Sequence, residues 1–344
     1  MRFGVWTPLP HTTVPEPRMA RAVEALSSRG AGGSEDDSFR MAADFLQRAE
    51  RYGFDMTLIA ARHLGPDLEA WTLAAALATQ TRAMELMVAA HPGVNTPQMV
   101  AKMAASLDRI SGGRCAVNVV NGWNQEEFET FGNGAWQTSE AERYARMDEY
   151  VQVMRGLWTQ DPFTFNGAYY RVQDSRLPLK TRRSELPLYA ASRSPEGKRT
   201  IARACDHWFV PDCRDFRRYD ETVALVTEEI ARMNELAHGF GRTIGYGMSA
   251  HVVCAATVEE AWRKAEALEA HGRAARYNRS SISGLAAGLV GTAELIAERI
   301  ARYESLGLGL LLLQFHPMEE GLDRFAEEVL PLLGGAQSRS GAAH

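Results

Sequence analysis

Short apolar segments alternate with longer amphipathic segments along this chain, and that alternation limits its fold more than any other feature. The apolar segments are rich in β-branched and aromatic residues, as expected of strands buried on both faces of a parallel sheet. Eight strands are predicted, over Arg2–Trp6, Asp55–Ala60, Met84–His91, Arg114–Val120, Pro187–Ser192, His207–Pro211, Ile244–Cys254 and Gly309–Phe315. Helices are predicted over Phe39–Tyr52, Trp71–Thr81, Thr96–Ile110, Glu140–Trp158, Tyr219–Ala237, Val258–His271, Thr292–Leu306 and Leu322–Leu333. Eight strand–helix units predict an α/β fold and favour a (β/α)8 TIM barrel over an open doubly wound sheet.

Composition excludes several classes of protein. The 38 Lys and Arg residues against 43 Asp and Glu residues give a net charge of −5 without long runs of like charge, so a nucleic-acid partner is not expected. The apolar segments are too short to cross a membrane, and the first residues do not resemble a signal peptide, so we expect a cytoplasmic protein. The 4 cysteines form no CxxC pair, which favours buried thiols over a metal site.

Three segments interrupt the alternation within a single predicted barrel domain over residues 1–333, and a short tail follows that domain. Residues 27–37 are polar and glycine-rich and are predicted to form a mobile loop. Residues 160–186 contain aromatic runs around Asn166-Gly167 and are predicted to form an inserted hairpin. Residues 271–290 could form a lid, and residues 334–344 are predicted to be a disordered tail.

Residues that could carry chemistry follow the predicted strands. In a parallel barrel, the carboxyl ends of the strands and the loops after them form the active site. The residues at these positions are Trp6, His63, His91, Asn121, Trp123, His251, Phe315 and His316. No HxH or HExxH spacing supports a metal site, so proton transfer or hydrogen bonding is the expected use of the histidines.

The segment SRSPEGKR is a candidate anion site because Ser192 and Ser194 precede a predicted helix, whose free N–H groups favour a phosphate. Ser194 followed by Pro195 also fits an ordinary helix N-cap. Arg143, followed by Tyr144, could add a cationic donor, although a solvated helix arginine is the simpler interpretation. Neither GxGxxG nor a P-loop motif is present, so a bound phosphate would belong to a mononucleotide.

Two segments, LDRISGGRCAVNVVNGWNQEEFETFG and ERYARMDEYVQVMRGLWTQDPFTFNGAYYRV, resemble the luciferase-like flavin monooxygenases. The chain is most similar to their dimethyl sulfone, alkanesulfonate and pyrimidine oxygenase branch, with the NxVxGW motif as the most specific feature. The resemblance implies a (β/α)8 barrel that binds FMN as FMNH2, delivered by a separate NAD(P)H-dependent flavin reductase, with O2 as co-substrate. Members of the family tend to form homodimers or homotetramers.

The resemblance also implies roles for individual residues. Asn118 and Glu127 match flavin-contacting positions, the Arg143-Tyr144 pair matches a pair near the FMN phosphate, and Ser194 matches the serine that binds that phosphate. Ser192, in the same segment, is expected to bind the cofactor as well. His251 matches a histidine on the seventh barrel strand, and we expect it to act in catalysis with Asn121 and His63. Trp6, His91, Trp123, Phe315 and His316 are expected to line the substrate pocket.

Two departures from the family pattern bear on the substrate. Ser249 stands where the sulfonate enzymes have an arginine, and Phe315 stands where they have a tyrosine. The sequence therefore predicts an FMNH2-dependent monooxygenase that acts on a small organosulfur or heterocyclic compound. An F420-dependent oxidoreductase of the same superfamily and a non-catalytic flavin-binding protein are the alternatives.

Overall fold

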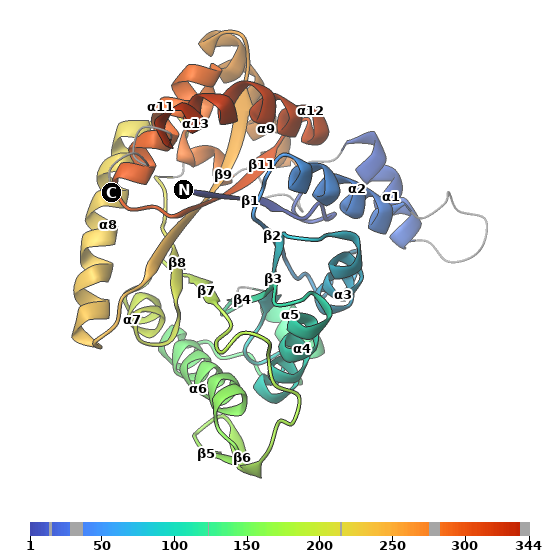
Figure 1. Cartoon of the computed structure of the whole chain (residues 1–344), viewed down its shortest axis with the longest axis vertical. Helices are drawn as coiled ribbons and strands as arrows, with labels where there is room; N and C mark the ends of the chain where they lie inside the picture. The colour runs from blue at the N-terminus through green and yellow to red at the C-terminus, as the bar shows by residue number, and fades with distance from the viewer. Residues whose placement is uncertain (14–15, 28–36, 123, 214, 275–282, 338–344) are drawn as a thin grey trace. The chain divides into compact units, whose positions relative to one another are not determined.

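The computed structural model describes residues 1–13, 16–27, 37–122, 124–213, 215–274 and 283–337 (Figure 1). Within these residues, eight parallel barrel strands lie where the apolar segments predict them. They are β1 (Arg2–Trp6), β2 (Met56–Ile59), β3 (Glu85–Ala90), β4 (Cys115–Val119), β7 (Leu188–Ala191), β8 (His207–Phe209), β9 (Gly245–Cys254) and β11 (Leu310–Phe315). Every residue of β2, β3, β4 and β11 is buried, which explains why their sequences are almost continuously apolar.

Helices follow the strands, mostly at the predicted positions. They are α1 (Pro17–Ser27), α2 (Ser38–Arg51), α3 (Ala70–Gln80), α4 (Pro97–Ile110), α5 (Gln125–Phe131), α6 (Glu140–Thr159), α7 (Pro195–Ala204), α8 (Tyr219–Gly239), α9 (Val258–Ala274), α11 (Ala293–Ser305), α12 (Met318–Arg324) and α13 (Leu330–Gln337). The sequence did not predict α1 or α5. Helix α1 buries few apolar side chains, and α5 has two helical turns, too few to establish a period.

The chain divides into two compact units. The first contains residues 1–54, 211–230 and 246–344, and its strands pair in the order β10 (Val290–Gly291), β9, β11, β1. Its core includes Phe325, whose ring centroid lies 5.8 Å from that of Phe3, 6.1 Å from that of Phe54 and 5.7 Å from that of Phe315. These aromatic contacts join β1, β11 and the helical C-terminal segment of this unit.

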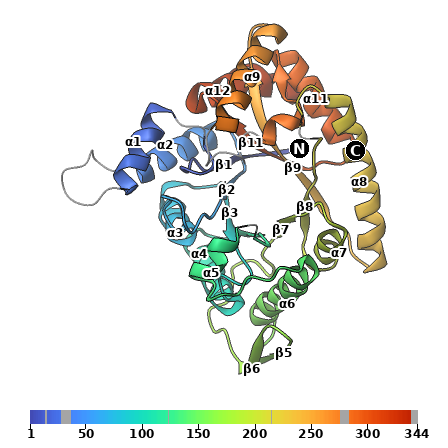
Figure 2. The same cartoon turned by 180° about the vertical axis from the view of Figure 1, so that it is seen from behind.

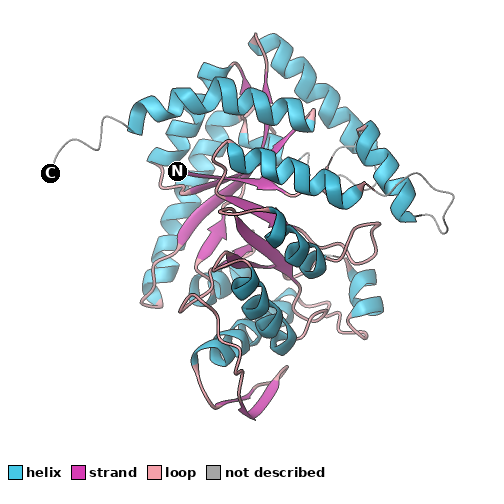
Figure 3. Ribbon diagram, turned by 45° about the vertical axis from the view of Figure 1, so that its right-hand side comes forward, coloured by secondary structure: helices cyan, strands magenta, loops and turns pink. Residues whose placement is uncertain are grey.

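The second unit contains residues 55–210 and 231–245, and its strands pair in the order β2, β3, β4, β7, β8. Each of these pairs is parallel. A separate antiparallel pair, β5 (Phe163–Asn166) and β6 (Arg171–Ser175), lies beside α6 (Figures 1 and 2). In both units helices flank the strands (Figure 3).

The strand and helix series has the predicted (β/α)8 barrel fold. Of the predicted mobile loop over residues 27–37, residues 28–36 lie outside the described part of the chain, and so do residues 275–282 of the predicted lid. The described part of that lid includes Gly284–Ala287, a buried 3-10 turn. No helix in the described residues is long and apolar enough to cross a membrane.

The C-terminal helix differs from the prediction. A helix was predicted over Leu322–Leu333 and a disordered tail over residues 334–344, but the structure has helix from Met318 through Gln337. It consists of α12, a π-helical stretch over Phe325–Val329 and α13. Burial of Leu322, Phe325 and Val329 accounts for the continuity along this segment. Residues 338–344 lie outside the described part of the chain.

Candidate functional site

Three hydroxyl groups of the second unit converge at the start of α7. The Tyr144 hydroxyl donates a hydrogen bond of 2.8 Å to Ser192 Oγ, and Ser192 Oγ lies 3.2 Å from Ser194 Oγ. Ser194 is the N-cap of α7, because its Oγ accepts a hydrogen bond of 3.2 Å from the Gly197 backbone N–H. The hydroxyls therefore meet at the positive end of a helix dipole, where a phosphate is stabilised.

Gly197 allows the chain to approach this hydroxyl cluster closely. A Cβ atom at this position would lie 2.0 Å from Ser192 Oγ and 2.5 Å from Tyr144 Cζ. Any larger residue would therefore displace the serine or the tyrosine. The cluster of Tyr144, Ser192 and Ser194, which the sequence analysis selected from separate segments, is built around this glycine.

Arg143 contacts the loop that precedes it. Its Nη1 donates to the backbone carbonyl groups of Gln137, at 2.6 Å, and Thr138, at 3.1 Å. Its guanidinium also lies 4.7 Å from the centre of the Trp136 ring, which is a cation–π geometry. In this arrangement Arg143 orders the segment before α6, and its role as a direct phosphate ligand stays a prediction.

Asn118 lies on β4 with its side chain buried. Among the described residues, none donates a hydrogen bond to its Oδ1 atom. A buried acceptor of this kind is stabilised when a ligand supplies an N–H or O–H group. Asn121 follows in the loop after β4, whereas Trp123 lies outside the described residues.

Glu127 of α5 is 3% exposed and forms an ion pair with Arg62, whose Nε atom lies 2.8 Å from Glu127 Oε1. The Leu64 backbone N–H also donates to Glu127 Oε1, at 3.4 Å. These contacts hold a buried carboxylate beside the loop after β2. The sequence analysis selected Glu127 but assigned no role to Arg62, although Arg62 directly precedes His63.

His63 and His91 form a pair of histidines at the ends of β2 and β3. His63 Nε2 and His91 Nδ1 lie 3.1 Å apart, within hydrogen-bond distance, and their rings are nearly perpendicular. Burial lowers the pKa of His63 although Glu127 and Glu69 act in the opposite direction. A neutral His63 can share one hydrogen with His91, which is the arrangement that proton transfer between imidazoles requires.

Among the described residues, His63, His91 and Glu127 form a group that could hold a metal ion. One potential ligand atom each of His63, His91 and Glu127 lies within 4.8 Å of the others. The carboxylate, however, already pairs with Arg62, and the two imidazoles already contact each other. A metal ion would have to displace both interactions, so the absence of a metal site stays our prediction.

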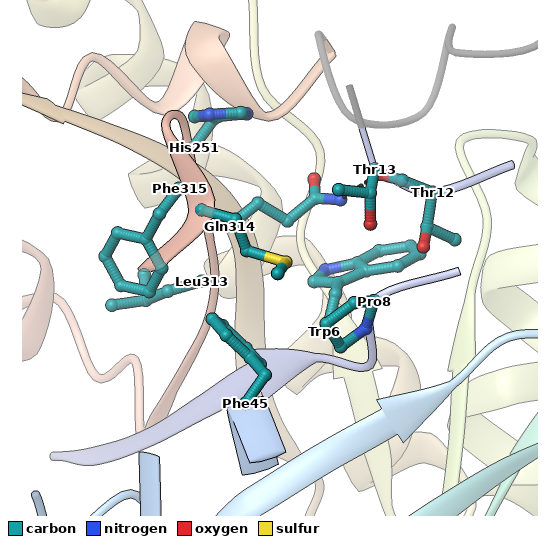
Figure 4. Close-up of a pocket in the computed structure, with 10 residues that line it drawn as sticks. Trp6, Pro8, Thr12, Thr13, Phe45, His251, Leu313, Gln314 and Phe315 are labelled. Atoms are coloured by element: carbon teal, nitrogen blue, oxygen red, sulfur yellow. Dashed lines mark hydrogen bonds between the residues drawn. The ribbon is translucent and has the colours of Figure 1, made fainter. Parts of the chain in front are cut away.

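The first unit holds a small pocket of its own. Trp6, Phe45, Phe315 and Met318 form apolar parts of its wall, and His251 lines it from β9 (Figure 4). The cavity between the lining side chains has a volume of about 20 Å³. This is far smaller than the pockets that enclose small molecules, so the side chains nearly fill the space between them. The structure thus brings together three residues that the sequence analysis selected, Trp6, His251 and Phe315.

His316, which was predicted to line the substrate pocket, contacts a different part of the first unit. Its Nδ1 lies 3.4 Å from Glu16 Oε1, and it lines a surface groove with Leu268 and His271. His91, also predicted for that pocket, belongs to the second unit and pairs with His63.

Sequence reasoning assigned no role to Gln314, which also lines the pocket of the first unit. This residue lies on β11 and pairs in register with His251 on β9. One sequence feature could have identified Gln314: it is a polar residue in the apolar run from Leu308 to Phe315.

Among the known proteins similar to this chain is the FMNH2-dependent dimethylsulfone monooxygenase of Pseudomonas putida. It is 28% identical over 330 residues, which cover 86% of this chain and 88% of the relative. A crystal structure of riboflavin lyase has a TM-score of 0.77 at 19% identity, covering all of this chain and 92% of the other. An F420-dependent secondary alcohol dehydrogenase has a TM-score of 0.70 at 21% identity, covering 96% and 98%.

The two structural likenesses confirm the fold and leave the cofactor open, since the enzymes differ in the cofactors or flavins named for them. The family is established by sequence. The model of the luciferase-like monooxygenases matches residues 1–309, which include the Asn118 motif, the hydroxyl cluster and His251. The chain belongs to the luciferase-like monooxygenase family.

Proposed function

We propose that this enzyme is the oxygenase component of a two-component system and uses reduced FMN and O2. A separate NAD(P)H-dependent flavin reductase supplies FMNH2 and contacts the oxygenase transiently in the cytoplasm. The substrate is a small organosulfur or heterocyclic compound, and the active form is a homodimer or homotetramer. The observation that carries the proposal is the hydroxyl cluster of Tyr144, Ser192 and Ser194 at the N-terminus of α7.

The described residues fit FMN in three respects. The hydroxyl cluster would hold the phosphate, as the helix dipole and three convergent hydroxyl groups favour an anion. Asn118 Oδ1, a buried acceptor, would accept a hydrogen bond from an N–H or O–H group of the flavin. Glu127, held by Arg62, would contact the flavin from α5.

When bound, reduced FMN supplies the electrons for the reaction of O2 with an organic substrate, which amino-acid side chains do not supply. The protein's own residues then bind the substrate and handle protons. Trp6 and Phe315 give the pocket of the first unit apolar walls that exclude water. His251 would move a proton at the substrate, and His63 and Asn121 would assist catalysis through hydrogen bonds.

The dimethylsulfone monooxygenase of Pseudomonas putida supports FMNH2 as the cofactor and an organosulfur compound as one substrate class. At 28% identity, and with Ser249 in place of the arginine of the sulfonate enzymes, the substrate itself needs a direct test. A heterocyclic substrate therefore stays within the proposal.

Anaerobic titration tests the cofactor. We expect FMNH2 to bind more tightly than riboflavin in its reduced form, because riboflavin lacks the phosphate, and more tightly than F420. In air, the protein supplied with a flavin reductase and NADH should consume O2 and form an oxygenated product. Preference for F420 would support a dehydrogenase instead, and flavin binding without product from any substrate tried would support a binding protein.

A further inference from the structure

The small cavity of the first unit lies between β9, β11 and the loop after β1. Its volume is about 20 Å³. By the same measure one water molecule needs about 10–15 Å³, so the cavity has room for a water and is too small for an organic substrate. The chemistry of its lining therefore decides whether water occupies it, since cavities that stay empty in proteins are apolar.

The lining of this cavity offers several polar groups. They come from Thr12 and Thr13 in the loop after β1, from His251 and from Gln314 (Figure 4). His251 is 1% exposed and Gln314 is 8% exposed, so both side chains lie away from bulk solvent. A buried water typically makes about three hydrogen bonds, and these groups can supply them.

The loop after β1 fixes the orientation of the Gln314 amide. Gln314 Nε2 donates a hydrogen bond of 2.8 Å to the Thr12 backbone carbonyl. The Thr12 hydroxyl donates to the Thr7 carbonyl, at 3.1 Å, and accepts from the Leu9 N–H, at 3.2 Å, so the loop holds the Thr12 carbonyl in place. A flipped amide would place Gln314 Oε1 against that carbonyl oxygen, and two acceptors cannot bond to each other.

Gln314 Oε1 consequently has a fixed position and needs a donor. Among the described residues, none donates a hydrogen bond to it. The Trp6 indole N–H, in the same lining, already donates to Ser249 Oγ at 3.0 Å. A buried carbonyl oxygen without a donor is costly, and a water molecule removes that cost. Dioxygen, the other small molecule of the proposed reaction, has no hydrogen to donate.

We propose that one ordered water molecule occupies this cavity, donates a hydrogen bond to Gln314 Oε1 and bonds a ring nitrogen of His251. Gln314 and His251 are paired in register on neighbouring parallel strands, and both side chains line the cavity. Thr13 supplies a third partner, because its hydroxyl accepts from the Leu9 N–H at 3.2 Å and can donate its own hydrogen to the water. The apolar walls exclude bulk water from the pocket, whereas this single molecule is a fixed part of the protein.

Gln314 thereby acts as a positioning residue for His251. The hydrogen donated to Gln314 Oε1 fixes the orientation of the water, and the hydrogen bond from the water sets which ring nitrogen of His251 carries the hydrogen. A histidine held in one tautomer presents the same nitrogen to the substrate in every reaction cycle. This inference rests on the proposed function, in which His251 moves a proton, and adds the residue that orients it.

Two measurements on the whole protein without flavin test the inference. A crystal structure should show one ordered water within about 2.5–3.2 Å of both Gln314 Oε1 and a ring nitrogen of His251. In ¹⁵N NMR spectra at a pH where His251 is neutral, its two ring nitrogens should give the well-separated signals of one tautomer, assigned by their loss in His251→Asn. Gln314→Met removes the acceptor and keeps the length of the side chain, so the water should be lost and the two signals should move closer together.

Gln98→Met is the matched control, because Gln98 is a glutamine of the second unit whose Nε2 donates to the Arg171 carbonyl. It should retain both the water and the separation of the two signals. Thr13→Val, which removes only the third partner of the water, should move the signals in the same direction as Gln314→Met and serves if that variant does not fold.

Two results would overturn the inference. One is a natural protein that has no water at Gln314 Oε1, and the other is a set of His251 signals that neither Gln314→Met nor Thr13→Val changes. Full product formation by His251→Asn supplied with FMNH2 would instead count against the proposed function, since the water and the tautomer are measured without flavin.

Discussion

A single hydroxyl group, that of Tyr144, connects α6 to the proposed phosphate site. Tyr144→Phe removes the one hydroxyl hydrogen that Tyr144 donates to Ser192 Oγ and that a bound phosphate would accept in its place, while it keeps the buried ring. A hydrogen bond contributes about 0.5–1.5 kcal/mol, and one to a charged group about 1.5–3 kcal/mol. We therefore expect FMN to bind about tenfold more weakly and riboflavin to bind as before, both measured by fluorescence titration.

The same helix offers a control for this substitution. Tyr150 is fully buried on α6, and its hydroxyl has no hydrogen-bond partner among the described residues. Tyr150→Phe should leave FMN affinity unchanged and keep or slightly raise the melting temperature. Equal losses of FMN affinity in the two variants would show that Tyr144 acts through packing and has no contact with the phosphate.

Burial of His63 makes the stability of the folded protein depend on pH. Because its pKa is lowered in the folded protein, the unfolded chain binds the proton more tightly. His63 therefore reduces stability as the pH falls below about 6.5, the ordinary histidine pKa, and has little effect above pH 7. We expect the melting temperature of His63→Gln to fall less than that of the natural protein between about pH 7 and pH 5. An unchanged slope would mean that His63 keeps its ordinary pKa.

At the level of elements, the hairpin of β5 and β6 depends on one residue of α6. The Glu149 carboxylate accepts backbone hydrogen bonds from Ala168, Tyr169 and Tyr170 at 2.7, 2.8 and 3.1 Å. Glu149→Ala should destabilise the hairpin locally by about 1–3 kcal/mol, since three N–H groups lose a charged acceptor at a partly exposed site. Hydrogen exchange should become faster over residues 163–175, while FMN affinity stays unchanged. Protection equal to that of the natural protein would indicate that the strand pairing alone holds the hairpin.

The elements also show what could be predicted from sequence. Strands such as β3 and β11 are buried along their whole length, so their sequences carry a strong apolar signal. The Asn166-Gly167 pair likewise indicated the turn between β5 and β6. The contacts of Glu149 with that turn and of Gln314 with Thr12 join residues that are distant in sequence. Neither composition nor periodicity predicts contacts between residues that are distant in sequence. The sequence could therefore identify candidate residues, but it could not show which of them are in contact.

For the whole molecule, the barrel fold is compatible with several cofactors, and the residues at the strand ends decide the chemistry. In the second unit these residues form the hydroxyl cluster and leave the buried acceptor of Asn118 available. In the first unit they form a neutral pocket around Gln314 and His251. The two sets differ in chemistry, because hydroxyl groups at a helix N-terminus favour an anion, whereas the described lining of the pocket in the first unit has no charged carboxylate, lysine or arginine side chain.

The prediction for the whole molecule concerns its dependence on a second protein. In the proposed function a separate flavin reductase takes the electrons from NADH, and the oxygenase receives them as FMNH2. The purified protein should therefore be nearly colourless, bind FMNH2 more tightly than oxidised FMN, and oxidise no NADH until a flavin reductase is added. Because the proposed reaction uses no metal, treatment with EDTA followed by gel filtration should leave the coupled rate unchanged. Yellow FMN retained through dialysis, NADH oxidation by the protein alone, or loss of activity restored by a divalent metal would each contradict this description. The last of these results would point to His63, His91 and Glu127 as the metal ligands.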